Sequence, residues 1–191
     1  MNALSYGWDG VLLEVDDPAA WYQTLLAARE SGVLECEEIV PAAATVLLRG
    51  VRRLPALNSL TPQSRPRDRR LVTLPVWWDG EDLDELGERW HEDPVKVLTR
   101  FEFTVAFCGF APGFAYLTGL PERFHVPRLN TPRTKVPAGS VAIAGPYAGV
   151  YPRTSPGGWR LLGHTEVTLF DVHSSDPALL TPGTRVRFAN A

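Results

Sequence analysis

Cysteine is scarce in this chain of 191 residues, which contains two, and long apolar runs are absent. Cys36 and Cys108 lie far apart, and neither belongs to a CxxC or a Cys/His pattern. A disulfide framework and a structural zinc site are therefore not expected. No run of about 18 apolar residues occurs, and the first residues lack the basic and apolar regions of a signal peptide. We expect a cytoplasmic protein that is neither exported nor inserted in a membrane.

Motifs for several common chemistries are also missing. There is no GxxxxGK[ST] loop and no GxGxxG after a strand, so any use of ATP requires another kind of site or a partner. Neither HExxH nor the serine-hydrolase motif GxSxG occurs, and the histidines are widely spaced, which gives a catalytic zinc little support. A serine nucleophile activated by His164 stays open, because the members of a triad are distant in sequence.

Charge is segregated along the chain, although the net charge is only −3. Residues 1–40 hold eight acids and one base, whereas residues 49–70 hold seven arginines and one acid. Residues 94–165 carry eight bases against two acids, Glu102 and Glu122. The small net charge argues against a protein that binds nucleic acid. The shortage of acids implies that carboxylates for proton transfer or for magnesium come from the other domain or from another chain.

The N-terminal part has the pattern of a small α+β domain. Apolar residues predict a strand at 10–15, and Pro18 after an aspartate cap predicts a helix that ends before Ser31. Short β-compatible runs follow at 39–40 and 45–48. Prolines and arginines then crowd residues 54–70, which we interpret as a linker. The predicted domain therefore covers residues 1–72, with the linker at its end.

The rest of the chain has the pattern of a β-rich domain. Residues 109–163 contain 17 prolines and glycines, which exclude long helices and favour short strands joined by turns. We predict an α+β fold in which residues 73–191 form a β-barrel or sandwich. The predicted elements are a strand at 71–77, helices at 81–92 and 94–98, and strands at 103–108, 140–144, 149–151, 159–162, 166–170 and 184–188.

Basic side chains gather in the turn-rich segment. Arg128, Arg133 and Lys135 lie close together between prolines, and Arg153 and Arg160 follow in a second such loop. Arginine binds carboxylate or phosphate through two parallel hydrogen bonds, and the N–H groups of glycine-rich turns can also bind anions. The pattern indicates a site for a small anionic ligand. The alternative interpretation is a set of surface arginines between turns.

Residues 107–120, which read FCGFAPGFAYLTGL, lead to a family. They resemble the GFxPGFxYLxGL signature of the family of the 5-oxoprolinase B subunit, also called KipI or allophanate hydrolase subunit 1. The resemblance continues through further ordered blocks and, more weakly, over most of the chain. The blocks are PRLNTPR at 127–133, VPAGSVAIAG at 136–145, GVYP at 149–152 and SPGGWRLLGHT at 155–165, with weaker agreement at 74–83 and 180–188.

This resemblance implies a small N-terminal α+β domain followed by a cyclophilin-like β-barrel. It also implies a subunit of a complex that cleaves 5-oxoproline to glutamate with ATP hydrolysis. Its partners there are a C subunit, similar to allophanate hydrolase subunit 2, and a separate A subunit. ATP is then a co-substrate of the complex, with magnesium accompanying it. Two alternatives come with the family: a protein that inhibits a sensor histidine kinase, and a carboxyltransferase half that acts on a urea-like substrate.

The same resemblance implies the site residues. Arg128 and Arg133 are the candidates to hold a carboxylate or phosphoryl group, and His164 is the candidate proton carrier. Trp159 either packs at the barrel rim or walls a small pocket. The other candidate substrate-binding residues are Phe110, Pro112, Gly113, Pro137, Gly139, Ser140, Tyr151, Ser155, Gly157 and Gly158.

The chain departs from the family pattern in two places. Residues 99–102 read TRFE where a histidine is common, and residues 147–149 read YAG where Gln-Thr-Gly is common. Arg100 and Tyr147 are the candidates to replace the missing polar groups.

Overall fold

The computed structural model describes residues 1–62 and 70–191, and the chain divides into two compact units, Met1–Arg67 and Asp68–Ala191. The arginine-rich part of the predicted linker lies outside the described residues. Strand β5 (Leu71–Val76) already belongs to the second unit, so that unit starts before the predicted boundary after residue 72. The assignment of the two units as domains stays a prediction. None of the helices among the described residues has the length and apolar character needed to cross a membrane.

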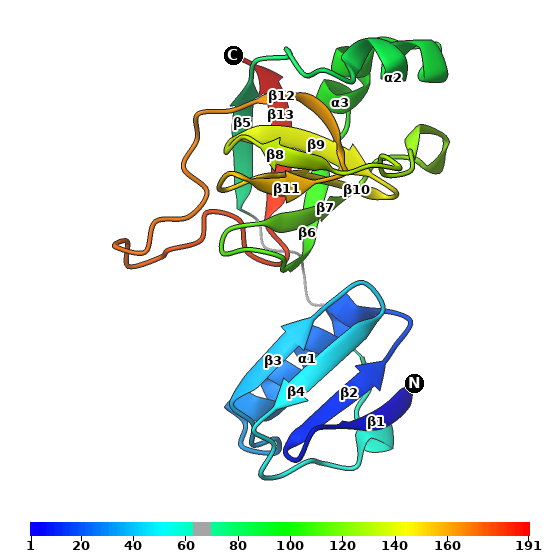
Figure 1. Ribbon diagram of the computed structural model, residues 1–191. Helices are drawn as coiled ribbons and strands as arrows, with labels where there is room; N and C mark the ends of the chain where they lie inside the picture. The colour runs from blue at the N-terminus through cyan, green and yellow to red at the C-terminus, as the bar shows by residue number, and fades with distance from the viewer. Residues whose placement is uncertain (63–69) are drawn as a thin grey trace. The chain divides into compact units, whose positions relative to one another are not determined.

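The first unit is an antiparallel sheet with one helix on one face (Figure 1). The strand order is β1-β2-β4-β3, and helix α1 (Pro18–Glu30) lies between β2 and β3 in sequence. Leu13, Val46 and Leu48 of the sheet and Leu25 of the helix are fully buried together and form the core. The strands are β1 (Asn2–Tyr6), β2 (Gly10–Glu14), β3 (Glu38–Pro41) and β4 (Thr45–Arg49).

The start of α1 follows from its first residues. Oδ1 of Asp17 accepts a hydrogen bond from the N–H of Ala20 at 2.9 Å, and Pro18 occupies the first position, where its missing N–H is not needed. Replacing Asp17 by alanine leaves that N–H without its partner, and we expect a loss of about 1 kcal/mol of stability. Urea unfolding monitored by circular dichroism measures the loss. The neighbouring exposed Asp16→Ala is the control, and an equal effect of the two substitutions would contradict the cap.

The second unit is built on a seven-stranded sheet that curves into a barrel (Figure 1). The strand order is β12-β9-β10-β7-β6-β13-β5, and every neighbouring pair is antiparallel except β13 and β5. The two end strands meet where Trp77 and His164 exchange backbone hydrogen bonds of 2.9 Å in both directions. The strands are β5, β6 (Phe103–Cys108), β7 (Ala115–Thr118), β9 (Ser140–Ala144), β10 (Tyr147–Val150), β12 (Arg160–His164) and β13 (Arg185–Asn190).

Smaller elements surround this barrel. A two-stranded ribbon pairs β8 (Arg133–Val136) with β11 (Ser155–Gly157). Helices α2 (Leu83–Trp90) and α3 (Pro94–Arg100) follow β5, and 3-10 turns cover Leu57–Ser59 in the first unit and Glu122–Phe124 in the second.

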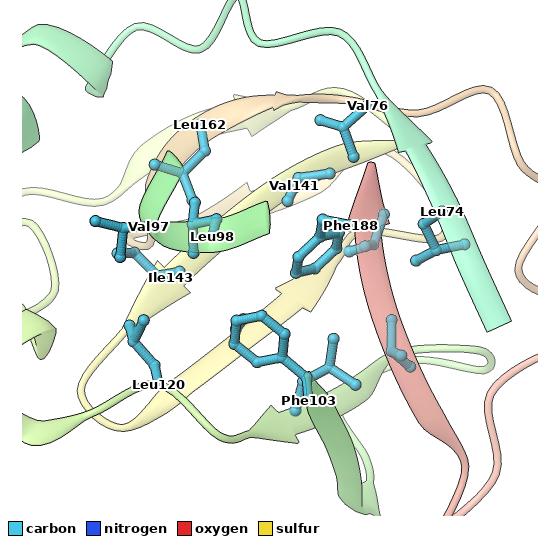
Figure 2. Packing of buried hydrophobic residues seen from close by; sticks show 14 of the residues in the cluster. Leu74, Val76, Val97, Leu98, Phe103, Leu120, Val141, Ile143, Leu162 and Phe188 are labelled. Atoms are coloured by element: carbon cyan, nitrogen blue, oxygen red, sulfur yellow. The ribbon is translucent and has the colours of Figure 1, made fainter. Parts of the chain in front are cut away.

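Large apolar side chains fill the barrel (Figure 2). Phe103 of β6 and Phe188 of β13 pack edge to face, with ring centroids 5.2 Å apart. Leu98 of α3 is fully buried in the same cluster, so this helix covers part of the barrel interior. Alternation on β6, where every second residue is buried, is the signal that predicted the strand.

The predicted strand at 166–170 is wrong, and β1, β7, β8 and β11 are not among the predicted elements. In residues 166–170, the apolar side chains of Val167 and Leu169 do pack on the core. The backbone, however, makes only an isolated bridge from Phe170 to Ala178, so the alternation belongs to an extended loop. Strand β1 is exposed along its whole length and therefore lacks the burial pattern that marks a strand in sequence.

Candidate functional site

A pocket of about 240 Å³ opens between the turn before β7, the β8–β11 ribbon and the start of β12. Aromatic rings, glycine backbone and a single cation form its walls. The lining residues are Phe110, Phe114, Tyr116, Arg128, Pro132, Tyr151, Pro156, Gly157, Gly158 and Trp159.

Edge-to-face contacts fix the aromatic walls. Phe114 lies at the centre, with ring centroids 5.4 Å from Tyr151, 5.5 Å from Trp159 and 5.3 Å from Phe110. Phe114, Tyr151 and Trp159 are all buried. Because each ring is held by others in favourable geometry, the walls are preorganised for a flat apolar ligand surface.

Phe110 stands out on this wall. Its φ angle is +67°, which is rare for a bulky residue, and its side chain is 61% exposed. Gly113, three residues later in the same turn, has a φ angle of +83°. A Cβ at this position would lie only 2.6 Å from Cβ of Phe170, so there is no space for a side chain. The tight turn thus presents a phenyl ring to solvent at the pocket mouth. A strained backbone that exposes an aromatic ring is typical of binding sites.

Arg128 is the cation of the pocket. It is exposed, and within the part of the chain that the structure describes its guanidinium makes no hydrogen bond or ion pair. Burial raises the pKa of Tyr151, and the positive charge of Arg128 opposes that rise, which places the guanidinium near the phenol. Arg128 therefore keeps its hydrogen-bond donors for a ligand.

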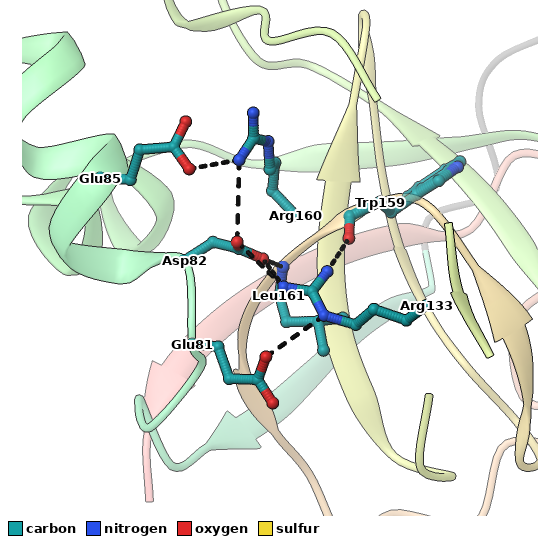
Figure 3. A network of polar contacts seen from close by, with 7 residues as sticks. All are labelled: Glu81, Asp82, Glu85, Arg133, Trp159, Arg160 and Leu161. Carbon is teal, nitrogen blue, oxygen red and sulfur yellow. Dashed lines mark hydrogen bonds and ion pairs between the residues drawn. The ribbon is translucent and has the colours of Figure 1, made fainter. Parts of the chain in front are cut away.

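Arg133 is engaged within the protein (Figure 3). Its Nη2 donates to Asp82, its Nε donates to Glu81 at 3.3 Å, and its Nη1 donates to the carbonyl oxygen of Trp159 at 3.2 Å. Its side chain is only 20% exposed, and Arg133 does not line the pocket. The structure therefore separates the two predicted anion-binding arginines, one facing the pocket and one behind it.

His164 lies at the far end of β12 from the pocket. Its Nδ1 is 2.9 Å from Oδ1 of Asp79, and its ring stacks on Trp77 with centroids 5.3 Å apart. The strand from Arg160 to His164 spans about 13 Å at the usual rise per residue. His164 is not among the lining residues, so the structure does not place it in the pocket with Arg128.

The other predicted residues lie in four kinds of position around the pocket. Tyr151, Gly157, Gly158, Trp159 and Phe110 line the pocket, whereas Pro112 and Gly113 form its turn. Gly139 and Ser140 support the wall: the N–H of Gly139 donates to the carbonyl of Tyr151 at 2.7 Å, and the carbonyl of Ser140 accepts from the N–H of Tyr151 at 2.9 Å. Pro137 and Ser155 lie outside the lining, and Oγ of Ser155 is buried without a hydrogen-bond partner among the described residues.

Neither candidate replacement residue lines the pocket. Arg100 pairs with Glu92 at 3.3 Å and lies over the ring of Phe101. Tyr147 packs edge to face on Phe107 and Tyr116, and burial raises the pKa of its phenol. The partners of Arg100 lie outside the pocket lining, whereas Tyr147 packs against one lining residue, Tyr116, from outside the pocket.

Four lining residues lie outside the predicted site: Phe114, Tyr116, Pro132 and Pro156. The sequence could have indicated these four residues, because each lies inside one of the motif blocks at 107–120, 127–133 and 155–165. Asp82, which binds Arg133, stands in the more weakly matching block at 74–83, and nothing in that block indicated a contact with Arg133.

The lining contains no carboxylate, and no group of three or more His, Cys, Asp or Glu residues that could hold a metal ion occurs in residues 1–62 and 70–191. A pocket of about 240 Å³ is also smaller than the roughly 300 to 1,000 Å³ of pockets for larger ligands. The lining therefore offers no carboxylate to hold magnesium; its aromatic surface and one guanidinium suit a small ring that carries one negative charge.

Comparison with known proteins shows to which family the chain belongs. Residues 5–180 match the family described as carboxyltransferase domain, subdomain C and D. The chain is 39% identical over 168 residues to a protein of Escherichia coli O157:H7 that is named as the B subunit of 5-oxoprolinase, covering 72% of this chain and 77% of that protein. A protein of the same name from Haemophilus influenzae is 44% identical over 125 residues, covering 62% and 59%.

Solved structures share the fold. The crystal structure of TTHA0988 aligns with a TM-score of 0.76 and 36% identity, covering 95% of this chain and 39% of that chain. The conserved uncharacterized protein PH0987 from Pyrococcus horikoshii aligns with a TM-score of 0.61 and 27% identity, covering 100% and 97%. The chain thus spans about two fifths of TTHA0988 and nearly all of PH0987. It belongs to the carboxyltransferase-domain family, subdomains C and D, and is a relative of the proteins named as the B subunit of 5-oxoprolinase.

Proposed function

We propose that the chain is a subunit of an ATP-dependent 5-oxoprolinase and that its aromatic pocket binds the substrate. 5-Oxoproline is a five-membered lactam ring with one carboxylate. The observation that carries the proposal is a small pocket walled by Phe114, Tyr151 and Trp159 with one uncommitted guanidinium, Arg128, at its edge. The ring would lie against the aromatic faces, and the carboxylate would accept two hydrogen bonds from Arg128.

The pocket supports binding but lacks the groups for the whole reaction. Cleaving the lactam amide requires proton transfer and, with ATP, stabilisation of a highly charged transition state. The lining contains no carboxylate or histidine, and His164 lies elsewhere on the barrel. We therefore propose that two partner chains, homologues of the C and A subunits, complete the site in the cytoplasm, and that they hold ATP with magnesium.

Reconstitution tests this function. The chain is mixed with the homologues of the C and A subunits, and ADP release is measured with and without 5-oxoproline. We expect release that depends on 5-oxoproline in the complete mixture and only background release from this chain alone. Omitting this chain is the matched control. A complete mixture that releases no ADP above background would refute the proposal.

The family description supports one second candidate. The chain would then be a carboxyltransferase half, and we expect it to act on a urea-like substrate with a partner that carries biotin. The same reconstitution separates the two functions when urea replaces 5-oxoproline and a biotin-carrying partner replaces the A subunit. Urea is neutral, so a carboxyltransferase would not depend on the free guanidinium of Arg128 for substrate charge.

A further inference from the structure

The carboxylate of Asp82 is buried where three segments of the second unit meet (Figure 3). Asp82 is 6% exposed and immediately precedes α2. Its oxygens accept hydrogen bonds from Nη2 of Arg133 at 3.0 and 2.9 Å and from the N–H of Leu161 at 2.6 Å. Nη1 of Arg160 lies 3.8 Å away and also pairs with Glu85. A buried carboxylate is unfavourable unless its charge and lone pairs are matched, and here both are matched.

The partners of Asp82 are the sequence neighbours of pocket-lining residues. Arg133 follows Pro132, and Arg160 follows Trp159; Pro132 and Trp159 both line the pocket. Consecutive side chains on extended backbone point to opposite sides, so one residue of each pair faces the pocket and the next faces Asp82. Arg133 adds a second link, because its Nη1 binds the carbonyl oxygen of Trp159. Asp82 therefore contacts, through Arg133 and Arg160, the backbone on which two lining residues of the pocket, Pro132 and Trp159, are placed.

We propose that Asp82 is a positioning residue for this pocket. It contacts no ligand itself. Through Arg133 and the N–H of Leu161 it sets the distance between the Pro132 wall and the Trp159 wall, and so the fit of a flat ring between them. The identity of that ring as 5-oxoproline rests on the proposed function. Small displacements of binding groups weaken binding strongly. A substitution of Asp82 should therefore change the affinity for the ligand, although Asp82 does not contact it.

A second carboxylate of the barrel offers a matched control. Glu102 binds Arg185 through two hydrogen bonds of 2.6 and 2.7 Å and also pairs with Arg187. Hydrogen bonding to Arg185 holds the pKa of Glu102 below its usual value. Neither Arg185 nor Arg187 lines the pocket. Removing this charge therefore perturbs a second, more exposed ion pair of the same unit without touching the pocket walls.

The experiment compares Asp82→Asn with Glu102→Gln in the reconstituted complex. We expect Asp82→Asn to raise KM for 5-oxoproline at least about tenfold with a much smaller change in kcat, and Glu102→Gln to leave KM unchanged. Asp82→Glu keeps the charge and should give a KM between those of the wild type and Asp82→Asn. If Asp82→Asn does not fold, the comparison is made with Asp82→Glu instead. Melting temperatures of all variants separate lost stability from lost fit.

Hydrogen exchange of each variant chain adds a readout that needs no activity. Faster exchange at 157–161 in Asp82→Asn, but not in Glu102→Gln, is the expected result. An active wild-type complex with an unchanged KM for the Asp82 variants would overturn the inference. If the wild-type complex is inactive, the proposed function fails instead, and unchanged exchange at 157–161 would still overturn the role of Asp82.

Discussion

Replacing Arg128 by alanine should lower kcat/KM for 5-oxoproline by about a hundredfold, because a charge-assisted hydrogen-bonded pair with the substrate carboxylate contributes about 1.5 to 3 kcal/mol. Arg128 is exposed and, among the described residues, has no hydrogen-bond or ion-pair partner to lose. The melting temperature should therefore stay the same. Steady-state kinetics of the reconstituted complex and thermal unfolding of the chain measure the two effects.

Arg153→Ala is the control for Arg128→Ala. Arg153 is exposed in the neighbouring loop and is absent from the pocket lining, so its removal changes the net charge equally. Arg128→Lys should recover part of the activity, since an ammonium group keeps the charge but not the planar pair of donors. Equal losses for Arg128→Ala and Arg153→Ala would show that general charge, not a specific contact, attracts the substrate.

Replacing Gly163 by alanine should destabilise the second unit by several kcal/mol. A Cβ at this position would lie 2.1 Å from the carbonyl oxygen of Trp77 and 3.0 Å from Cα of Trp78. Both contacts are to backbone at the place where β12 meets the chain after β5, so neither atom can move without opening the barrel. Steric overlap of this kind in a packed structure is among the substitutions with large effects. Denaturant unfolding followed by tryptophan fluorescence measures the loss.

Gly87→Ala is the opposite test within the same unit. Gly87 lies in α2, and a Cβ there would meet only side-chain atoms of Pro94, at 3.6 and 3.8 Å, which are ordinary contacts. Alanine in a helix is favoured over glycine by up to about 1 kcal/mol, so this variant should be slightly more stable than the wild type. A Gly163→Ala variant with the stability of the wild type would show that the barrel seam can widen.

Local patterns predicted the elements whose causes are local. The Asp17 cap and the helix after it, and the alternation of Phe103, Val105 and Phe107, needed only neighbouring residues. Strands β8 and β11 escaped prediction because they are short and their residues are partly exposed. Their pairing depends on each other, and no local pattern reports it.

The site residues, like the strands, could be predicted where local sequence identifies them and not where a distant contact decides their role. The motif blocks identified most of the pocket walls, such as Phe110, Tyr151 and Trp159. They did not distinguish Arg128 from Arg133, because both are arginines in a proline-rich segment. What separates them is Asp82, which is 51 positions from Arg133 in sequence and 2.9 Å away in space. The fold creates a contact between residues so far apart, and their spacing in the sequence does not predict it.

The parallel pairing of β5 with β13 sets an order for folding during synthesis. The two strands pair from Leu71 with Arg185 to Val76 with Asn190, so the first strand of the barrel hydrogen-bonds the last. A ribosome must therefore make residue 190 before the β5–β13 ladder can be completed. Until then, β5 has an unpaired edge and its Leu74 lacks the covering Phe188, which leaves apolar surface open to other chains. The nascent second unit thus keeps the apolar face of β5 uncovered until its last strand has been made.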